Sequence, residues 1–392
     1  MRVAMKASPR FVLASFGAVC LLLAAAAACP ARVVENAAQL AEAVAQANSG
    51  GDKLIELADG VYHLDNGLWV EAAGVTVRSL SGHRDAVRIL GQGMDGGVSH
   101  VFWAAASDFT VRDLTLGQVA NHAVQVHGDL DADNFKMINC RVIDTGEQLL
   151  KVSYDPARPD LRSDNGLVEG CLFEFTAGIA PQWYTGGVDA HQSSGWVVRG
   201  NIFRGIRSPS EDVAEFAVHF WSDSADTIVE RNLIINCDRG IGFGLGERGH
   251  RGGVIRNNMI YHDASEGFAD VGIALESASG ARVYNNTVFQ EHGYPNAIEY
   301  RFEATSGGLI ANNLVNRAIA SRDGGGADLR ANLADAQAAW FRDARAGDLA
   351  LAGPLSQVVD RAAEVEGLSE DYFGTSRPQG GGFDIGAHEY VE

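Results

Sequence analysis

The chain has 392 residues, in which 50 Asp and Glu outnumber 31 Lys and Arg, so the formal net charge is −19. Hydrophobic residues make up 46% of the chain and charged residues 21%, which excludes wholesale disorder and allows a large buried core. The excess of negative charge argues against nucleic acid or an anionic membrane as the main partner.

The N-terminal segment has the pattern of a targeting sequence. Arg2, Lys6 and Arg10 are followed by an apolar run that ends in alanines at residue 28. This pattern predicts a secretory signal peptide over residues 1–28, and no later stretch is long enough to span a membrane. Cys29 follows this segment directly, so two outcomes are possible for the expected bacterial exported protein. Cleavage releases it as a periplasmic or secreted protein, or lipidation of the cysteine anchors it as an outer-membrane lipoprotein.

A short helix is predicted next, beginning at residue 36. Asn36 and Gln39 have the spacing of a capping box, and Leu40, Val44 and Ala47 share one helix face. A Ser-Gly-Gly run ends the helix, and two short alternating segments follow on either side of an Ala-Asp-Gly turn. We therefore expect a capping helix followed by β-structure.

The central part of the chain repeats itself. A six-residue phrase occurs eight times, and the copies are 26 to 31 residues apart. The fourth positions of the eight copies are Leu114, Cys140, Cys171, Asn201, Asn232, Asn258, Asn286 and Asn313. No copy carries a 3.6-residue apolar stripe, and each has short apolar runs around a turn, so the repeat predicts stacked β-strands.

Stacked turns place identical residues above one another, about 4.8 Å apart. The asparagines of the repeat should then form a buried hydrogen-bonded ladder, as side-chain amides do in cross-β stacks. Cys140 and Cys171 should continue the column as free thiols. These residues are therefore predicted to be structural rather than catalytic.

The repeat, the capping helix and the phrase Leu57-x-Asp59-Gly60-x-Tyr62 together resemble the right-handed parallel β-helix, or pectin-lyase-like, superfamily. The start is similar to that of polysaccharide lyase family 6, which includes alginate lyases and chondroitinase B. The phrase Phe383–Glu389 looks like a closing phrase of secreted bacterial β-helix proteins. The resemblance implies an all-β, single-stranded right-handed parallel β-helix over residues 33–320. A short helix caps its N-terminal end, and an irregular or helical cap over residues 321–392, with a helical tract near residues 334–341, packs on its last turns.

A second strand follows each ladder turn, and its alternation sends every other residue to one outer face. One outward column holds Gln125, Lys151, Asp189, His219, Gly242, Ala274 and Glu299. The other holds His127, Ser153, His191, Trp221, Gly244, Glu276 and Arg301. Histidines, a tryptophan, a lysine and carboxylates beside two glycines predict a carbohydrate-binding trough. A polar face that binds no ligand is the alternative.

Long insertions are expected to border this face, because loops on one side of a repeat array often shape a cleft. The loops and strands supply basic and aromatic residues to an otherwise acidic protein. The residues predicted to bind substrate are Trp183, Tyr184, Trp221, Arg239, Arg248, Glu276, Glu299 and Arg301. This set suits an anionic or neutral oligosaccharide.

Cleavage by a lyase needs a base, a group that neutralises the developing enolate, and an acid for the leaving oxygen. Residues 147–153 are similar to the phrase that carries the base lysine in polysaccharide lyase family 6, so the resemblance implies that role for Lys151. Nearby cations are expected to lower the pKa of this lysine. His191 or His219 is the alternative acid or base, and Asp189 orients a histidine or binds a cation.

Two other functions stay open. A glycoside hydrolase needs two facing carboxylates, but Asp189 and Glu276 should lie three strands, about 14 Å, apart. A non-catalytic carbohydrate-binding β-helix is the second. A loop with Asp263, Glu266 and Asp270 leaves calcium open as a cofactor, and no other cofactor is indicated. We expect a monomer that acts on a polysaccharide or oligosaccharide.

Overall fold

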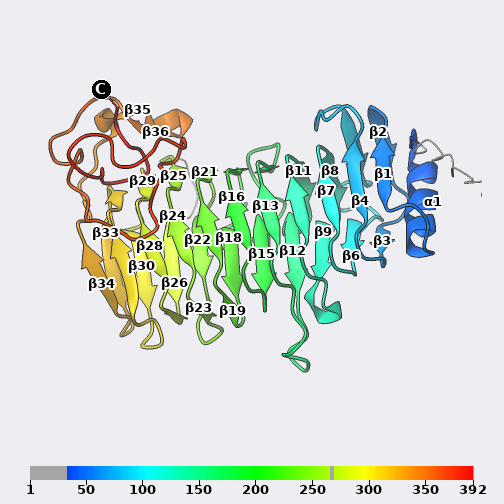
Figure 1. Ribbon diagram of the computed structural model, residues 1–392, viewed down its shortest axis with the longest axis horizontal. Coiled ribbons are helices and arrows are strands. Elements are labelled where there is room, and N and C mark those ends of the chain that lie inside the picture. The colour runs from blue at the N-terminus through cyan, green and yellow to red at the C-terminus, as the bar shows by residue number, and fades with distance from the viewer. Residues whose placement is uncertain (1–32, 265–268, 392) are drawn as a thin grey trace, which may run out of the picture.

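The computed structural model describes residues 33–264 and 269–391, so the predicted signal peptide, Cys29 and Glu266 lie outside the described residues. Three long parallel sheets, called sheets 1, 2 and 3 below, run side by side along the molecule (Figure 1). Each turn of the chain adds one strand to each sheet in order, which makes a parallel β-solenoid.

Sheet 1 consists of β1 (Leu54–Leu57), β4 (Thr76–Ser79), β7 (Thr110–Arg112), β10 (Lys136–Ile138), β13 (Leu167–Glu169), β16 (Val197–Arg199), β20 (Ile228–Glu230), β24 (Val254–Arg256), β28 (Arg282–Tyr284), β31 (Gly308–Ala311) and β34 (Ala327–Arg330). Sheet 2 consists of β2 (Gly60–His63), β5 (Val87–Leu90), β8 (Thr115–Val119), β11 (Arg141–Thr145), β14 (Leu172–Glu174), β17 (Ile202–Arg204), β21 (Leu233–Ile235), β25 (Met259–His262), β29 (Thr287–Gln290) and β32 (Leu314–Val315).

Sheet 3 consists of β3 (Leu68–Val70), β6 (His100–Ala104), β9 (His122–His127), β12 (Leu150–Ser153), β15 (Val188–His191), β18 (Phe216–Trp221), β22 (Arg239–Phe243), β26 (Ile273–Glu276), β30 (Asn296–Arg301) and β33 (Ala318–Arg322). A small parallel sheet joins β19 (Ser224–Ala225), β23 (His250–Arg251) and β27 (Ala278–Ser279), and an antiparallel pair joins β35 (Phe341–Asp343) and β36 (Asp348–Leu351).

Helix α1 (Ala37–Asn48) covers the N-terminal end of the solenoid, as predicted (Figure 1). Asn36 Oδ1 accepts a hydrogen bond from the backbone N–H of Gln39 at 3.0 Å. The Gln39 side chain accepts from the backbone N–H of Glu35 at 2.8 Å, which completes a capping arrangement. Leu40, Val44 and Ala47 are buried against the first turns.

The asparagine ladder is confirmed. Asn201, Asn232, Asn258 and Asn286 each donate a side-chain N–H to the amide oxygen of the next asparagine at 2.9–3.0 Å. The ladder ends one step later than the repeat indicated, because Asn313 donates to the side chain of Asn332 at 2.9 Å. Cys140 and Cys171 are free and buried, and they extend the column in the other direction.

The C-terminal segment differs in part from the expectation. The stacked strands continue past residue 320 to β34, and the expected helix near residues 334–341 is only a 3₁₀ turn at Ala338–Trp340. The tail lies over the later strands of sheet 2 (Figure 1), where Phe341 and Leu349 pack with Met259, Tyr261 and Phe289. The tail therefore covers sheet 2 of the last turns by apolar burial rather than by a helix.

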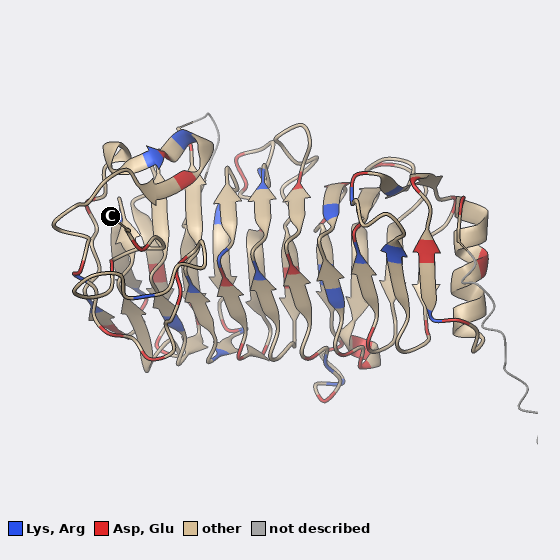
Figure 2. Ribbon diagram, turned by 45° about the horizontal axis from the view of Figure 1, so that its top comes forward, with Lys and Arg blue, Asp and Glu red and all other residues tan. Residues whose placement is uncertain are grey.

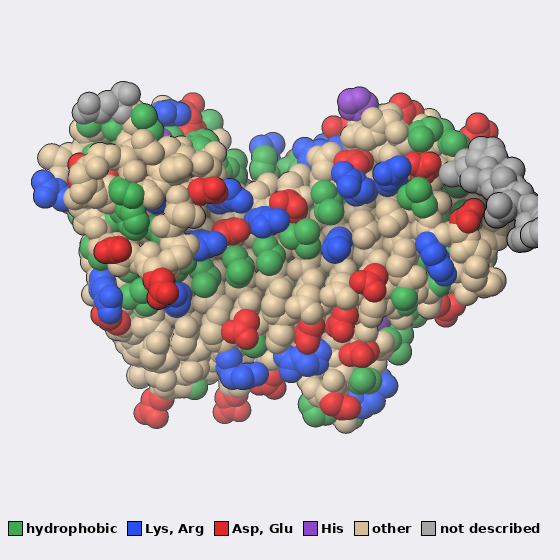
Figure 3. All heavy atoms as spheres, viewed as in Figure 1, with side chains coloured by type: hydrophobic (Ala, Val, Ile, Leu, Met, Phe, Trp, Pro, Cys, Tyr) green, Lys and Arg blue, Asp and Glu red, His purple; other side chains and the backbone are tan. Residues whose placement is uncertain are grey.

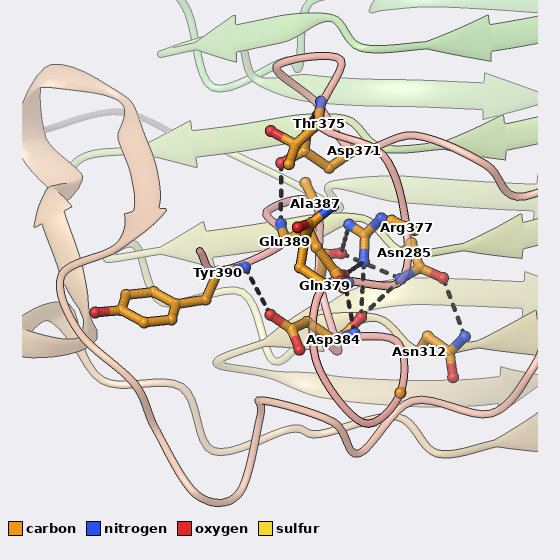
Figure 4. A network of polar contacts seen from close by, with 12 residues as sticks. Asn285, Asn312, Asp371, Thr375, Arg377, Gln379, Asp384, Ala387, Glu389 and Tyr390 are labelled. Carbon is orange, nitrogen blue, oxygen red and sulfur yellow. Dashed lines mark hydrogen bonds and ion pairs between the residues drawn. The ribbon is translucent and has the colours of Figure 1, made fainter. Parts of the chain in front are cut away.

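A buried polar network anchors the tail (Figure 4). Arg377 and Glu389 form an ion pair at 2.8 Å, and both side chains are fully buried. Asn285, at a turn of the solenoid, donates to the backbone oxygen of Asp384 at 2.9 Å. The predicted closing phrase therefore binds the tail to the repeat.

Charged side chains are spread along the whole molecule, and both signs are interspersed on the strands (Figure 2). The space-filling view shows the same mixture, with an upper edge that is hollowed between the C-terminal tail and the loops near β2 and β8 (Figure 3). In the part of the chain that the structure describes, no helix is long and apolar enough to cross a membrane.

Candidate functional site

The outer face of sheet 3 carries the predicted columns. Lys151 on β12 pairs in register with Asp189 on β15, and Asp189 pairs with His219 on β18. His191 pairs with Trp221 on the same two strands. Because adjacent parallel strands are about 4.8 Å apart, these five side chains come together on three successive turns. We call them the sheet 3 cluster.

Two side chains contact the Asp189 carboxylate directly. Lys151 Nζ donates to Asp189 Oδ2, and Trp221 Nε1 donates to Oδ1 at 2.7 Å. Lys151 Nζ also donates to His191 Nε2 at 3.0 Å, and His191 Nδ1 donates to Ser222 Oγ at 3.0 Å. The cluster is therefore a connected network in which the ammonium group joins a carboxylate to an imidazole.

The expectation that Lys151 readily loses its proton is wrong. Burial disfavours its ammonium form, but the charge of Asp189 and the hydrogen bond to it outweigh that effect, and the pKa of Lys151 is raised. The Lys151 ammonium in turn lowers the pKa of the buried Asp189. Burial also lowers the pKa of His191 to about 3. The resting cluster therefore holds a cation, an anion and a neutral imidazole.

A second set of polar contacts within the cluster centres on His219. His219 Nε2 donates to the backbone oxygen of Gly244 at 3.1 Å, so its Nδ1 carries the lone pair. That Nδ1 lies 3.7 Å from Asp189 Oδ1 and 3.8 Å from Glu215 Oε2. Among the described residues, neither Nδ1 nor Glu215 Oε2 has a hydrogen-bond partner, and both atoms are buried.

A proton on Glu215 would relieve the repulsion in this arrangement. An imidazole lone pair that faces two carboxylates is unfavourable unless one of them is protonated. Burial, together with the charge of Asp189, raises the pKa of Glu215. Burial lowers the pKa of His219 to about 4, so both shifts favour the neutral forms of Glu215 and His219.

Trp221, also a member of the cluster, contacts a histidine on one side and an arginine on another. Its ring stacks on His219 at 4.9 Å with an angle of 9° between the planes, and the Arg248 guanidinium lies 3.9 Å from its centroid. Only 8% of Trp221 is exposed. The Trp221 indole therefore holds Asp189 in place, and the Arg248 guanidinium covers the indole ring.

The glycines of the columns do not open a trough. A Cβ on Gly242 would lie 2.9 Å from the Phe216 ring and 3.0 Å from His219. Gly244 has a φ of +74°, and a Cβ there would lie 1.8 Å from the backbone oxygen of Glu276. These glycines allow close packing and a left-handed turn, and neighbouring groups fill the space above them.

Four other predicted residues line a second cavity of about 160 Å³ further along sheet 3, and they are Arg239, Glu276, Glu299 and Arg301. Their charges are paired, because Arg301 contacts Glu276 at 3.1 Å and Glu299 contacts Arg322 at 2.8 Å. Arginines and carboxylates therefore line this cavity together with apolar side chains such as Phe216 and Val271.

The loop residues Trp183 and Tyr184 are exposed, at 46% and 37%. Trp183 lines an open cavity of about 440 Å³ together with Glu215 and Arg239. This cavity therefore borders the cluster through Glu215.

Glu215 and Tyr154 are site residues that the sequence columns missed. Glu215 is the last residue of an insertion before β18, and Tyr154 directly follows β12 and stacks on His191 at 4.4 Å. Both lie outside the two-residue alternation that defined the columns. The only sequence signal was their position at the ends of long loops next to column residues.

The described residues do not form a site suited to a metal ion. No group of three or more His, Cys, Asp or Glu in residues 33–264 and 269–391 has such an arrangement. Asp270 contacts Arg239 at 3.4 Å, and Glu266 of the same acidic loop lies outside the described part.

Comparisons with known proteins bear on the fold. A family model described as a right-handed β-helix region matches residues 160–305, and no curated protein matches the chain in sequence. The crystal structure of pectate lyase Pel9A is 14% identical with a TM-score of 0.62, and the match covers 88% of this chain and 90% of that chain.

Two further structures have lower TM-scores. An alginate lyase from Paenibacillus sp. str. FPU-7 is 15% identical over 68% of this chain and 94% of that chain, with a TM-score of 0.45. A PL6 family polysaccharide lyase from Pseudopedobacter saltans is 12% identical over 77% of this chain and 92% of that chain, with a TM-score of 0.37. At 14% identity, the likeness to the pectate lyase concerns the fold alone. Together with the matching family model and the three parallel sheets, this likeness shows that the chain is a right-handed parallel β-helix protein.

Proposed function

We propose that this protein is a polysaccharide lyase that cleaves a uronate-containing polysaccharide by β-elimination. The observation that carries the proposal is the buried Lys151 ammonium, which bridges Asp189 and His191 on the outer face of a β-helix. Such a group suits a reaction that develops negative charge on a substrate carboxylate. The pectate lyase with the similar fold supports the substrate class by analogy.

The first role belongs to Lys151. Its ammonium moves on a flexible stem from His191 to the uronate carboxylate, and Arg248 assists as a second cation. The cation then neutralises the enolate that forms when the neighbouring ring carbon loses its proton. This is the role of a charge stabiliser, and it replaces the base role that the family resemblance implied.

His191 is the base in this proposal. Once Lys151 leaves Nε2, the lone pair of that atom is free, and Ser222 holds the ring through Nδ1. Asp189 Oδ2 lies 3.8 Å from Nε2, so it stabilises the imidazolium that forms when the proton arrives. Glu215 then gives its proton to the leaving oxygen, and a double bond forms in the sugar ring.

One observation favours glycoside hydrolysis as a second candidate. Asp189 and Glu215 lie 3.7 and 3.8 Å from the same atom of His219, so two carboxyl groups with opposite pKa shifts are close together. A protonated acid beside an ionised carboxylate is the requirement of a glycosidase. Asp189 is already engaged by Lys151 and Trp221, which ranks hydrolysis below elimination.

A panel of polysaccharides tests the proposal. The purified protein is incubated with polygalacturonate, alginate and chondroitin, and with neutral glucans as controls. The proposal expects ultraviolet absorbance from the new double bond on at least one uronate polymer. New reducing ends without that absorbance support hydrolysis, and no products from any polymer contradict both enzymatic functions.

We also propose that the protein acts outside the cytoplasm and as a monomer. The basic, then apolar, sequence of residues 1–28 supports export, and Cys29 decides between a free protein and a lipoprotein. Helix α1 covers the N-terminal end of the solenoid, which removes the strand edges there through which copies could stack. Mass spectrometry of the mature N-terminus and sedimentation analysis test these two points.

A further inference from the structure

The column that contains Lys151 continues toward the N-terminal end of sheet 3. Trp69 on β3 pairs in register with Trp103 on β6, and Trp103 pairs with Gln125 on β9. Gln125 in turn pairs with Lys151. The strands β3, β6, β9 and β12 follow one another in the same row (Figure 1). Two tryptophans therefore lie on the same outer face and in line with the sheet 3 cluster.

The two indoles form a rigid unit. Their centroids are 4.8 Å apart and their planes differ by 7°. His127 packs on Trp69 at 5.3 Å, and His100 packs on Trp103 at 3.6 Å while it bonds to Gln125 at 3.1 Å. We call this pair the tryptophan platform. Its orientation is fixed by ring contacts and does not depend on a ligand.

The platform is open to solvent although its rings are apolar. Trp69 is 43% exposed, whereas Trp221 in the cluster is 8% exposed and Trp196 in the core is fully buried. A core role would bury the Trp69 ring, and an exposed, immobilised aromatic ring is instead typical of a binding surface. Neighbouring rings already restrict both side chains, so binding would lose little side-chain entropy there.

We propose that the tryptophan platform binds a sugar ring of the polysaccharide, away from the bond that is cleaved. The apolar C–H face of a pyranose matches an aromatic surface, and the indole N–H groups suit its hydroxyls. Trp69 lies three strands from Lys151, about 14 Å, which is longer than one sugar ring. The platform and the cluster therefore engage different rings of one extended chain.

The identity of the polymer in this inference rests on the proposed function. The platform itself defines the kind of ligand, which is a sugar ring. No cation–π pair among the described residues involves either indole, so binding there uses the sugar ring rather than its carboxylate. The platform should thus add affinity for longer oligosaccharides and leave the turnover of the shortest cleavable ones unchanged.

Native electrophoresis in gels that contain polygalacturonate, alginate or chondroitin tests the platform. The variants are Trp69→Ala and Trp69→Phe, and Phe373→Ala serves as a control because that ring is 54% exposed on the tail. We expect at least one polymer to retard the wild type and Phe373→Ala equally. The dissociation constant should rise about fivefold or more in Trp69→Ala, and less in Trp69→Phe, which keeps a ring.

The outcomes separate this inference from the proposed function. If retardation depends on Trp69 but no unsaturated product forms, the platform proposal is supported and the lyase proposal is overturned. Unsaturated product with equal retardation of Trp69→Ala and the wild type overturns the platform alone. Retardation by none of the polymers overturns the platform as well, and so does a change from dimer to monomer in Trp69→Ala, because a second copy would then be its occupant.

Discussion

At the scale of single residues, the chemistry of this face depends on which atom faces which charge. The two-residue alternation and the repeat register were enough to predict that Lys151, Asp189 and His219 share a column. They could not predict that Asp189 bonds directly to Lys151, because that depends on how two neighbouring side chains lean. The direction of the Lys151 pKa shift was therefore predicted wrongly, and the raised pKa of Glu215 was not predicted.

Substitutions of Lys151 distinguish a charge stabiliser from a base. Lys151→Met should reduce kcat by about 100-fold or more, because the developing enolate loses its cation. Lys151→Arg keeps the charge but cannot act as a base, so it should retain measurable turnover. Lys136→Met, which removes an exposed lysine on β10, is the control. Complete inactivity of a folded Lys151→Arg would favour the base role.

Glu215 should determine how activity changes at alkaline pH. A general acid must be protonated, so kcat should fall as pH rises through the raised pKa of Glu215. Glu215→Gln should lower kcat by about 100-fold with little change in KM, and it should remove that alkaline fall. A pH profile of kcat for both proteins provides the measurement. An unchanged alkaline limb in the variant would exclude Glu215 as the acid.

At the scale of structural elements, repetition made the fold predictable. The column of asparagines identified the stacked turns because each copy adds one strand to each sheet. The last ladder member, Asn332, was missed because it follows Asn313 by 19 residues, a shorter turn than any in the repeat. The tail was hard to predict for a related reason: its core pairs Phe341 with Phe289, a contact that no local period encodes.

Asn258→Leu tests the ladder as a structural element. Asn258 is fully buried, accepts from Asn232 at 3.0 Å and donates to Asn286 at 2.9 Å. Leucine leaves these groups unpaired, so unfolding free energy should fall by about 1–3 kcal/mol for each one. Chemical denaturation measures the change. Lost activity with unchanged stability would mean that the asparagine has a catalytic role instead.

At the scale of the whole molecule, burial of titratable groups links stability to pH. Burial lowers the pKa of six histidines to about 3 or 4, well below the ordinary value of 6.5. The six are His100, His122, His191, His219, His250 and His292. At a pH between the folded and the ordinary pKa values, these histidines stay neutral in the folded chain, whereas the same histidines bind protons in the unfolded chain.

Stability should therefore fall as the solution is acidified from pH 7.5 to 5.5. The contribution of each histidine is fully present above the unfolded pKa and is lost as pH falls toward the folded one. The expected loss of unfolding free energy is about 1 kcal/mol for each histidine over this pH interval. The interval lies above the pH range in which carboxyl groups ordinarily titrate. Urea denaturation at the two pH values measures it. Equal stability at both values would contradict neutral, buried histidines.

The central claim is that this face breaks a glycosidic bond by elimination and adds no water. Mass spectrometry of the products from a defined uronate oligosaccharide tests the claim most directly. The account predicts two fragments whose masses add up to that of the substrate, and their formation should be about 100-fold slower or more in Lys151→Met. Fragments that together weigh one water molecule more than the substrate, or equal cleavage by Lys151→Met, would contradict it.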